Sequence, residues 1–213
     1  MLMMGPIDLS NYAIKLQGES VFARLGGFVS FSGSVLETDR LLLRPPIADD
    51  LPGYSAFFGD SEATRFIGGP QPPSVAWWYL RTVAGAWALD GFYFFTVIEK
   101  STGAWIGRIG PIYPSGWPGR EVGWGLLPAY WGKGYAKEAA TAAMNFAFDA
   151  LGWEQVIHVI DPGNDRSIAL AKALGSRNTG PGRLPAPFSE WPVEIWAQSR
   201  DEWRSVPRRL AQK

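Results

Sequence analysis

Two glycines that stand one residue apart, Gly132 and Gly134, have a spacing that suits the binding of an anion. An apolar segment, residues 122–127, precedes them, and an alanine-rich segment that extends to about residue 151 follows them. Glycine has no Cβ atom, so a ligand can come close to the backbone there. The first turn of a helix adds N–H groups without partners, backed by the positive end of the helix dipole. This stretch therefore predicts a phosphate or pyrophosphate site at a strand-to-helix junction.

Two common phosphate-binding motifs do not fit this stretch. A Walker A loop would need a glycine at the position of Leu127. A Rossmann fingerprint that began at Gly132 would need a small residue at Lys137, and one that began at Gly123 would need it at Pro128. The junction must belong to another class of phosphate site.

The composition limits the kind of protein and partner. The chain has 213 residues, of which 46% are hydrophobic, and a formal net charge of zero. This length and apolar content suit one domain with its own core. Because no overall positive field exists, we expect neither nucleic acid nor an anionic membrane as a partner. A small molecule or a protein terminus is the expected substrate.

The sequence also limits the chemistry and the compartment. It has no cysteine and one histidine, which excludes disulfides and a covalent cysteine intermediate and argues against any metal site. No apolar run approaches the roughly 20 residues that span a bilayer, and residues 1–8 lack the pattern of a signal peptide. We therefore expect a cytoplasmic protein.

The residue patterns predict a mixed α/β fold in one domain, residues 36–205. Strands are expected at residues 36–44, 92–99, 104–112, 121–127, 154–160 and 193–199. Helices are expected at about residues 50–58, 74–89, 135–151 and 165–174, and a loop at residues 178–187. Residues 1–35 are expected to be an extension, either with a short edge strand near residues 26–33 or without structure, and residues 206–213 a basic tail.

Four segments, taken in order, resemble the GCN5-related N-acetyltransferase (GNAT) superfamily. Residues 104–110 and 121–124 resemble its central hairpin, and the WGKGYA segment at residues 131–136 resembles its Q/R-x-x-G-x-G/A pyrophosphate loop. The NDRS segment at residues 164–167 resembles its Asn-x-x-Ser/Ala helix start. Residues 36–44, 137–139 and 202–203 resemble the ribosomal-protein-alanine N-acetyltransferase (RimJ/RimL-like) subgroup.

This resemblance implies an acyl-CoA N-acyltransferase fold, in which two central parallel strands splay apart. It further implies acetyl-CoA as cosubstrate without a metal, and direct transfer to a primary amine in a ternary complex. The acceptor would be a protein N-terminal α-amine or a small-molecule amine, and a homodimer is one possible assembly. The competing hypothesis is an acyl-CoA-binding sensor or scaffold with weak catalysis.

The resemblance also implies a set of coenzyme-binding residues. Backbone amides near Leu126 and Leu127 would face the thioester oxygen, Asn164 and Ser167 would lie along the pantetheine arm, and the loop residues would hold the diphosphate: Trp131, Gly132, Lys133, Gly134, Tyr135 and Ala136. Three positions depart from the family pattern. Trp131 replaces Gln or Arg, Ala171 replaces a tyrosine often proposed as general acid, and Ser176 replaces an aromatic residue.

Glu121 is the expected general base, with an exposed carboxylate that balances Arg120 as the alternative. Glu190 and Glu194 are rivals for this role. Ser167 is the candidate donor to the departing thiolate, but a serine in a first helical turn more often bonds its own backbone.

Two further residues have more than one role open to them. Asn164 has two compatible roles, a pantetheine contact and a helix N-cap. His158 is expected to be a core or surface residue rather than a catalytic one.

Overall fold

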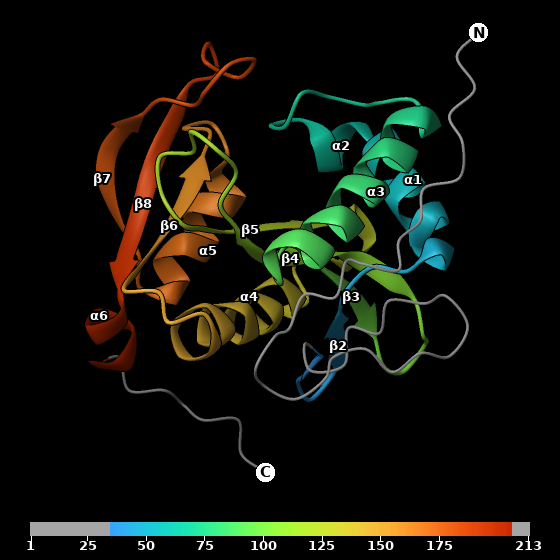
Figure 1. The fold of residues 1–213 in the computed structure, drawn as a ribbon, viewed down its shortest axis with the longest axis horizontal. Coiled ribbons are helices and arrows are strands. Elements are labelled where there is room, and N and C mark those ends of the chain that lie inside the picture. The colour runs from blue at the N-terminus through green and yellow to red at the C-terminus, as the bar shows by residue number, and fades with distance from the viewer. Residues whose placement is uncertain (1–34, 206–213) are drawn as a thin grey trace, which may run out of the picture. The chain divides into compact units, whose positions relative to one another are not determined.

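The computed structural model describes residues 35–205, which form a mixed sheet with helices on both faces (Figure 1). In chain order the strands are β1 (Leu36–Glu37), β2 (Leu41–Arg44), β3 (Phe95–Glu99), β4 (Trp105–Ile112), β5 (Glu121–Leu126), β6 (Gln155–Ile160), β7 (Arg177–Gly182) and β8 (Val193–Ser199). Their spatial order is β1-β2-β3-β4-β5-β6-β8-β7. The predicted mixed α/β fold is therefore confirmed.

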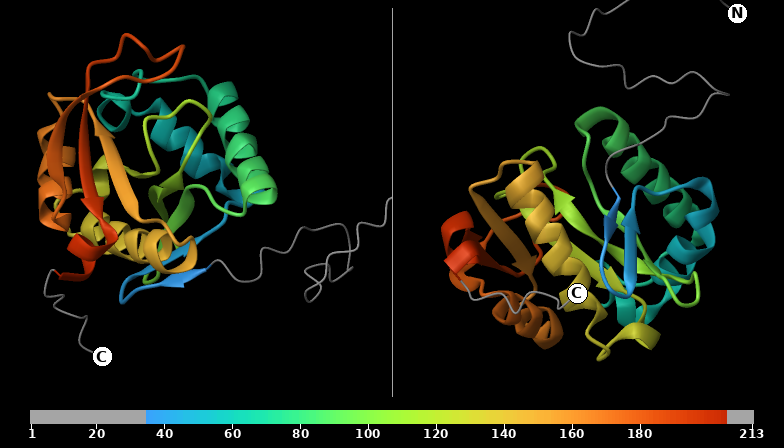
Figure 2. Two further views of the ribbon diagram at one scale, coloured as in Figure 1. Left: turned by 60° about the vertical axis from the view of Figure 1, so that its left-hand side comes forward. Right: turned by 90° about the horizontal axis from the view of Figure 1, so that it is seen from below.

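The helices divide between the two faces of this sheet. They are α1 (Leu51–Gly59), α2 (Ser61–Thr64), α3 (Pro73–Asp90), α4 (Tyr135–Asn145), α5 (Asp165–Leu174) and α6 (Arg200–Ser205), with short 3-10 helices η1 (Ala48–Asp50) and η2 (Pro128–Tyr130). Helices α1 and α3 pack together over one face of the central strands, and α4 runs along the opposite face (Figure 2). Among residues 35–205, no helix is both long and apolar enough to cross a membrane.

Most alanines of the alanine-rich segment after the glycine loop are buried in the helix α4 and its extension. Ala139, Ala140, Ala143 and Ala147 are fully buried, and α4 contacts β4 and β5. Small side chains let the helix backbone approach the sheet closely, which fixes the position of its N-terminal end. The helix becomes a π-helix at η3 (Phe146–Ala150), although one continuous helix was predicted.

The two central parallel strands separate soon after they meet. β5 and β6 have one registered pair, Glu121 with Ile157, beside the bond from the Ile157 N–H to the carbonyl of Arg120 at 2.9 Å. Beyond this pair, side chains bridge the strands, because the Val159 N–H donates to the Glu121 carboxylate at 3.3 Å. The implied splay of the central strands is thus confirmed, and it opens the backbone of β5 toward its C-terminal end.

His158 is a buried core residue beside this splay. Its Nδ1 lies 2.7 Å from the Val122 carbonyl, and its Nε2 lies 3.0 Å from the Ser176 hydroxyl. A carbonyl only accepts, so Nδ1 carries the proton and Nε2 accepts from Ser176. Burial lowers the pKa of His158 to about 4, which keeps the ring neutral. The serine that replaces the family's aromatic residue therefore satisfies a buried imidazole.

Ser176→Ala is expected to destabilise the fold by about 1–3 kcal/mol, because it leaves the Nε2 of His158 buried without a donor. Urea unfolding at pH 7 measures this loss. Ser101→Ala, at an exposed turn residue, is the control and should shift stability by less than about 0.5 kcal/mol. Equal stability of the two variants would contradict the assigned hydrogen bond.

Two predicted boundaries were wrong for local reasons. Within the predicted loop, β7 forms the sheet edge beside β8, with an irregular register between Asn178 and Gly180. Glycine and proline at residues 180–182 indicate a turn, but an edge strand tolerates them because one side makes no ladder bonds. The predicted first strand is a hairpin of β1 and β2. The predicted edge strand at residues 26–33 and the tail at residues 206–213 lie outside the described residues.

Candidate functional site

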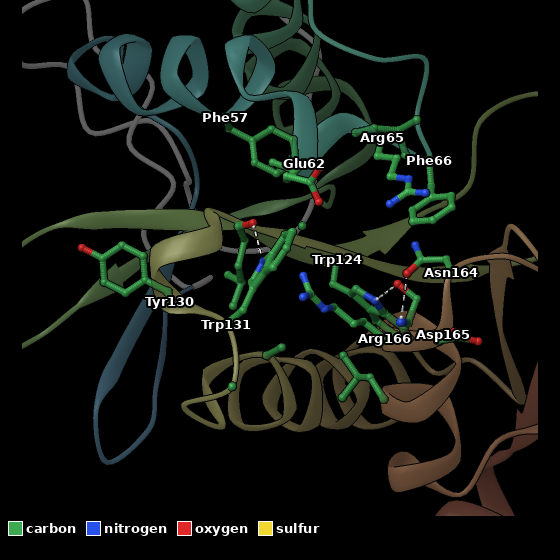
Figure 3. A pocket seen from close by; sticks show the side chains of 18 of the residues that line it. Phe57, Glu62, Arg65, Phe66, Trp124, Tyr130, Trp131, Asn164, Asp165 and Arg166 are labelled. Carbon is green, nitrogen blue, oxygen red and sulfur yellow. Dashed lines mark hydrogen bonds between the residues drawn. The ribbon is translucent and has the colours of Figure 1, made fainter.

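A cavity of about 800 Å³ lies beside the C-terminal half of β5, between α2, the glycine loop and the start of α5 (Figure 3). Its lining includes seven of the predicted site residues: Leu126, Trp131, Gly132, Gly134, Ala136, Asn164 and Ser167. The structure thus brings the end of β5 and the glycine loop that follows it together with the start of α5, about 30 residues further along the chain. The remaining predicted residues, Leu127, Lys133, Tyr135 and Glu121, do not line this cavity.

The glycine loop presents backbone amides to the cavity. Helix α4 makes its first helical hydrogen bond from Glu138 to the carbonyl of Gly134 at 3.1 Å, so the three preceding amides lack intrahelical acceptors. Gly134 is the N-cap and supplies no side-chain acceptor. Gly132 and Gly134 have φ of 71° and 82°, a conformation that favours glycine. The loop therefore has the glycine conformations and the free first-turn amides that the predicted anion site requires.

A side-chain network on the far side of the loop holds it in place. Arg40 Nε donates to Glu138 Oε2 at 2.7 Å, and Arg40 Nη1 donates to the carbonyl of Lys133 at 3.0 Å. Thr38 donates to the same carboxylate at 2.6 Å. The buried Tyr135 donates its hydroxyl to Glu99. Lys133 and Tyr135 thus stabilise the loop through groups that point away from the cavity.

Trp131 occupies the position of the family's Gln or Arg and has a structural partner. Its indole N–H donates to the carbonyl of Leu126 at 2.9 Å, which ties the loop to the end of β5. The guanidinium of Arg166, from the first turn of α5, lies 4.3 Å from the indole ring centroid (Figure 3). Arg65 and Lys137 also line the cavity. A cation from α5 therefore stands beside the position where the loop lacks one.

The start of α5 is capped by its own sequence motif. Asn164 Oδ1 accepts from the N–H of Ser167 at 3.2 Å, so the N-cap role is real. Trp124 donates its indole N–H to the hydroxyl oxygen of Ser167 at 3.1 Å. Among residues 35–205, the Asn164 side-chain NH2 and the Ser167 hydroxyl hydrogen have no acceptor, and both residues border the cavity.

Only one of the two backbone amides predicted near the thioester is available. The Leu127 N–H donates to the carbonyl of Ile106 at 2.9 Å, so we exclude it from this role. Leu126 pairs with Gly107 in the antiparallel ladder. Leu127 and Ile106 form a hydrogen-bonded pair, and in an antiparallel ladder such pairs alternate with non-bonded pairs, so Leu126 and Gly107 form a non-bonded pair. The Leu126 N–H therefore points away from β4 and toward the splay between β5 and β6.

Glu121 is buried on the α1 side of β5, 7% exposed. It accepts from the Trp117 indole N–H at 2.6 Å as well as from Val159. Burial raises the pKa of this carboxyl to about 7, against the lowering effect of the hydrogen bond from Trp117. The alternative of an exposed carboxylate is therefore wrong, and Glu121 is poised to exchange a proton near neutral pH.

The rival carboxylates lie elsewhere. Glu194 accepts from Asn178 at 2.7 Å on the β7–β8 hairpin, and Glu190 is exposed beside Ser189. Sequence reasoning missed Phe57, Arg65 and Phe66, which line the cavity from the α1–α2 region. Arg65 and Phe66 also line a second hollow of about 200 Å³ against Trp191. No local motif marks these residues, because they reach the site through tertiary packing.

Comparison with known proteins agrees with this geometry. Residues 40–177 match the family described as acetyltransferase (GNAT) domain. The chain is 28% identical over 150 residues to the uncharacterized N-acetyltransferase YoaA of Bacillus subtilis, which covers 68% of this chain and 84% of that protein. It is 29% identical over 147 residues to the uncharacterized protein YkkB of the same organism, and the alignment covers 66% of this chain and 83% of that protein.

Solved structures of acetyltransferases also resemble this chain. An acetyltransferase from Agrobacterium tumefaciens superposes with a TM-score of 0.69 at 26% identity, covering 86% of this chain and all of that one (100%). A putative ribosomal-protein-serine acetyltransferase from Vibrio cholerae shares the fold, with a TM-score of 0.68 at 23% identity over 78% of this chain and 98% of that one. The chain therefore belongs to the GNAT acetyltransferase family and is an acyltransferase.

Proposed function

We propose that residues 36–205 form a catalytic domain that moves the acetyl group of acetyl-CoA to a primary amine by direct transfer in a ternary complex. The acceptor is a protein N-terminal α-amine or a small-molecule amine. The observation that carries the proposal is the row of free amides at the α4 N-terminus, which borders a cavity that continues along the splayed end of β5.

The cavity walls fit the parts of this cosubstrate in order. The amides of residues 135–137 and the positive charges of Lys137 and Arg166 suit the diphosphate. The Asn164 amide suits a polar group of the pantetheine arm. The Leu126 N–H suits the thioester oxygen, where it would stabilise the negative charge that develops during attack.

Glu121 is the proposed base. The acceptor amine, with a pKa near ~10, is mostly protonated at neutral pH and must lose a proton before its nitrogen attacks the thioester carbon. Glu121 takes this proton directly or through a water molecule. The C–S bond then breaks, and the thiolate of coenzyme A leaves and is protonated. A carboxyl whose pKa is about 7 suits this role because its conjugate base is both present and basic at neutral pH.

Ser167→Ala is expected to lower kcat less than tenfold, because the Ser167 oxygen already accepts from Trp124 and its amide is part of the α5 cap. The measurement is steady-state turnover together with the Kd of coenzyme A. A loss above tenfold with unchanged Kd would instead assign protonation of the thiolate to Ser167.

The proposed function is tested by mixing the protein with acetyl-CoA and a panel of amines and peptides while measuring free thiol. Release of thiol that depends on both protein and acceptor is the expected result. Tight coenzyme binding without acceptor-dependent release would favour the sensor or scaffold hypothesis.

A further inference from the structure

A buried arginine lies under α1 and α3 beside the proposed base. Arg108, from β4, is 7% exposed, and its guanidinium carbon lies 4.1 Å from the ring centroid of Phe94, 5.1 Å from that of Tyr79 and 5.4 Å from that of Phe57. Within residues 35–205, its Nε has no hydrogen-bond partner and no carboxylate is within ion-pair distance of its guanidinium. A buried cation without an anion is costly, and aromatic faces offset only part of that cost.

Arg108 lies close to several other polar groups, among them Tyr79, Tyr93 and Glu121. Burial raises the pKa of Tyr79, of Tyr93 and of Glu121, and in each case the positive charge of Arg108 acts in the opposite direction. One guanidinium is therefore close enough to influence all three groups. Among the described residues, neither tyrosine hydroxyl has a hydrogen-bond partner, and none of the four side chains bonds another. The Arg108 Nε and the two tyrosine hydroxyls are therefore donors without an acceptor among residues 35–205.

Gly123, one of two glycines in β5, shapes this arrangement. A Cβ at Gly123 would lie 3.1 Å from the Phe94 ring and 3.4 Å from Glu121 Oε1. The missing side chain lets the Phe94 ring, on which Arg108 stacks, lie close to β5 beside the Glu121 carboxyl. Above Glu121, the loop residue Trp117 packs on Phe188, with ring centroids 6.4 Å apart, and Phe188 is 37% exposed. These two aromatic side chains are what separates the Glu121 carboxyl from solvent on the side of the two loops.

We infer that Arg108 binds an anionic group of the acceptor while Glu121 receives its amine, so that the acceptor is a free amino acid or a similar small amino-carboxylate. The inference rests on the proposed function and selects among its acceptors. A carboxylate would supply the anion that Arg108 lacks and would accept hydrogen bonds from Tyr79 and Tyr93. The N-terminus of a protein carries a neutral amide at the corresponding position and leaves the buried cation unpaired.

The test compares matched acceptors. The value of kcat/KM is measured for several α-amino acids and for the amines that lack only their carboxylate. We expect the wild-type protein to favour the amino acids by at least 30-fold, and Arg108→Met to reduce this ratio to near one. Arg81→Met is the control, since Arg81 also stacks on an aromatic ring, that of Trp77, but at the surface of α3. Its ratio should equal that of the wild-type protein.

Two results would overturn the inference without touching the proposed function. One is a wild-type protein that acetylates simple amines or peptide N-termini as efficiently as amino acids. The other is an Arg108 variant that loses activity by the same factor on both acceptors, as a mere counterion of Glu121 would. If Arg108→Met does not fold, Arg108→Lys takes its place, because lysine lacks the planar fork that holds a carboxylate at two points. The kcat/KM ratio of amino acid to matched amine, in this variant and in the wild-type protein, then decides. Coenzyme binding without acetylation of any amine would contradict both the proposed function and the proposed acceptor class.

Discussion

Glu121→Gln is expected to lower kcat by about 100-fold or more, because general-base catalysis typically contributes this much. Glutamine has a similar shape and can still accept from Trp117, so the change removes the proton acceptor and little else. In the wild-type protein, kcat/KM should rise with pH through about 7, the pKa to which burial raises this carboxyl. The variant should lack that rise.

The control for this prediction is Glu194→Gln, which removes a carboxylate from the β7–β8 hairpin where it bonds Asn178. It should keep the wild-type rate and pH profile. The assignment of the base would be wrong if Glu194→Gln lost the pH-dependent rise while Glu121→Gln kept both rate and profile.

Glu121→Gln, which is expected to lower activity, should raise stability relative to the wild-type protein as the pH increases. The pKa of Glu121 is about 7 in the folded protein, against an ordinary value of 4.5. Between these values the folded state binds more protons than the unfolded state, so the Glu121 contribution falls as pH rises from 4.5 to 7. Glutamine does not titrate, so the Glu121→Gln variant does not lose stability in this way as the pH rises. The Tm difference between Glu121→Gln and wild type should therefore be more favourable to the variant at pH 8 than at pH 4.5.

Gly132→Val is expected to weaken coenzyme A binding by about 100-fold or more. A Cβ at Gly132 would meet no atom of the protein within 4 Å, so the added side chain would occupy only the space in which we place the diphosphate. At φ 71° a side chain is strained. The effect on binding must therefore be separated from strain.

Gly103→Val makes that separation. Gly103 also has φ of 71°, and a Cβ there would likewise meet nothing within 4 Å, but the residue lies in the β3–β4 turn and not in the cavity. Both variants place a valine at the same positive φ. We expect Gly103→Val to bind coenzyme A like wild type in a calorimetric titration. Equal loss in both variants would attribute the effect to strain and remove support for the diphosphate site.

Local sequence carried enough information for the parts of the site that depend on backbone conformation. Gly132 and Gly134 need a positive φ, and Asn164 can cap the helix that follows it, so each pattern predicts its own geometry. The alanine-rich segment after the glycines likewise predicted the helix at residues 135–151. The order of these motifs then predicted the sheet that joins them.

The rest of the site depends on contacts between distant segments. Nothing near Arg108 in the sequence predicts a buried guanidinium, because its surroundings come from α1, α3 and the residues before β3. The bond of the Leu127 amide depends on the register of β4 and β5. The burial of Glu121 depends on the loop that brings Trp117 over it. Such facts follow from tertiary packing, which no single segment specifies.

The central claim is that backbone amides at the start of α4 bind the diphosphate of coenzyme A. Amide NMR spectra recorded during titration with coenzyme A, and with pantetheine as the ligand without a diphosphate, test it most directly. We predict that coenzyme A shifts the amide signals of Tyr135, Ala136 and Lys137, that pantetheine does not, and that Gly103 stays unchanged with both. Saturable coenzyme A binding that leaves those three signals in place would contradict the account.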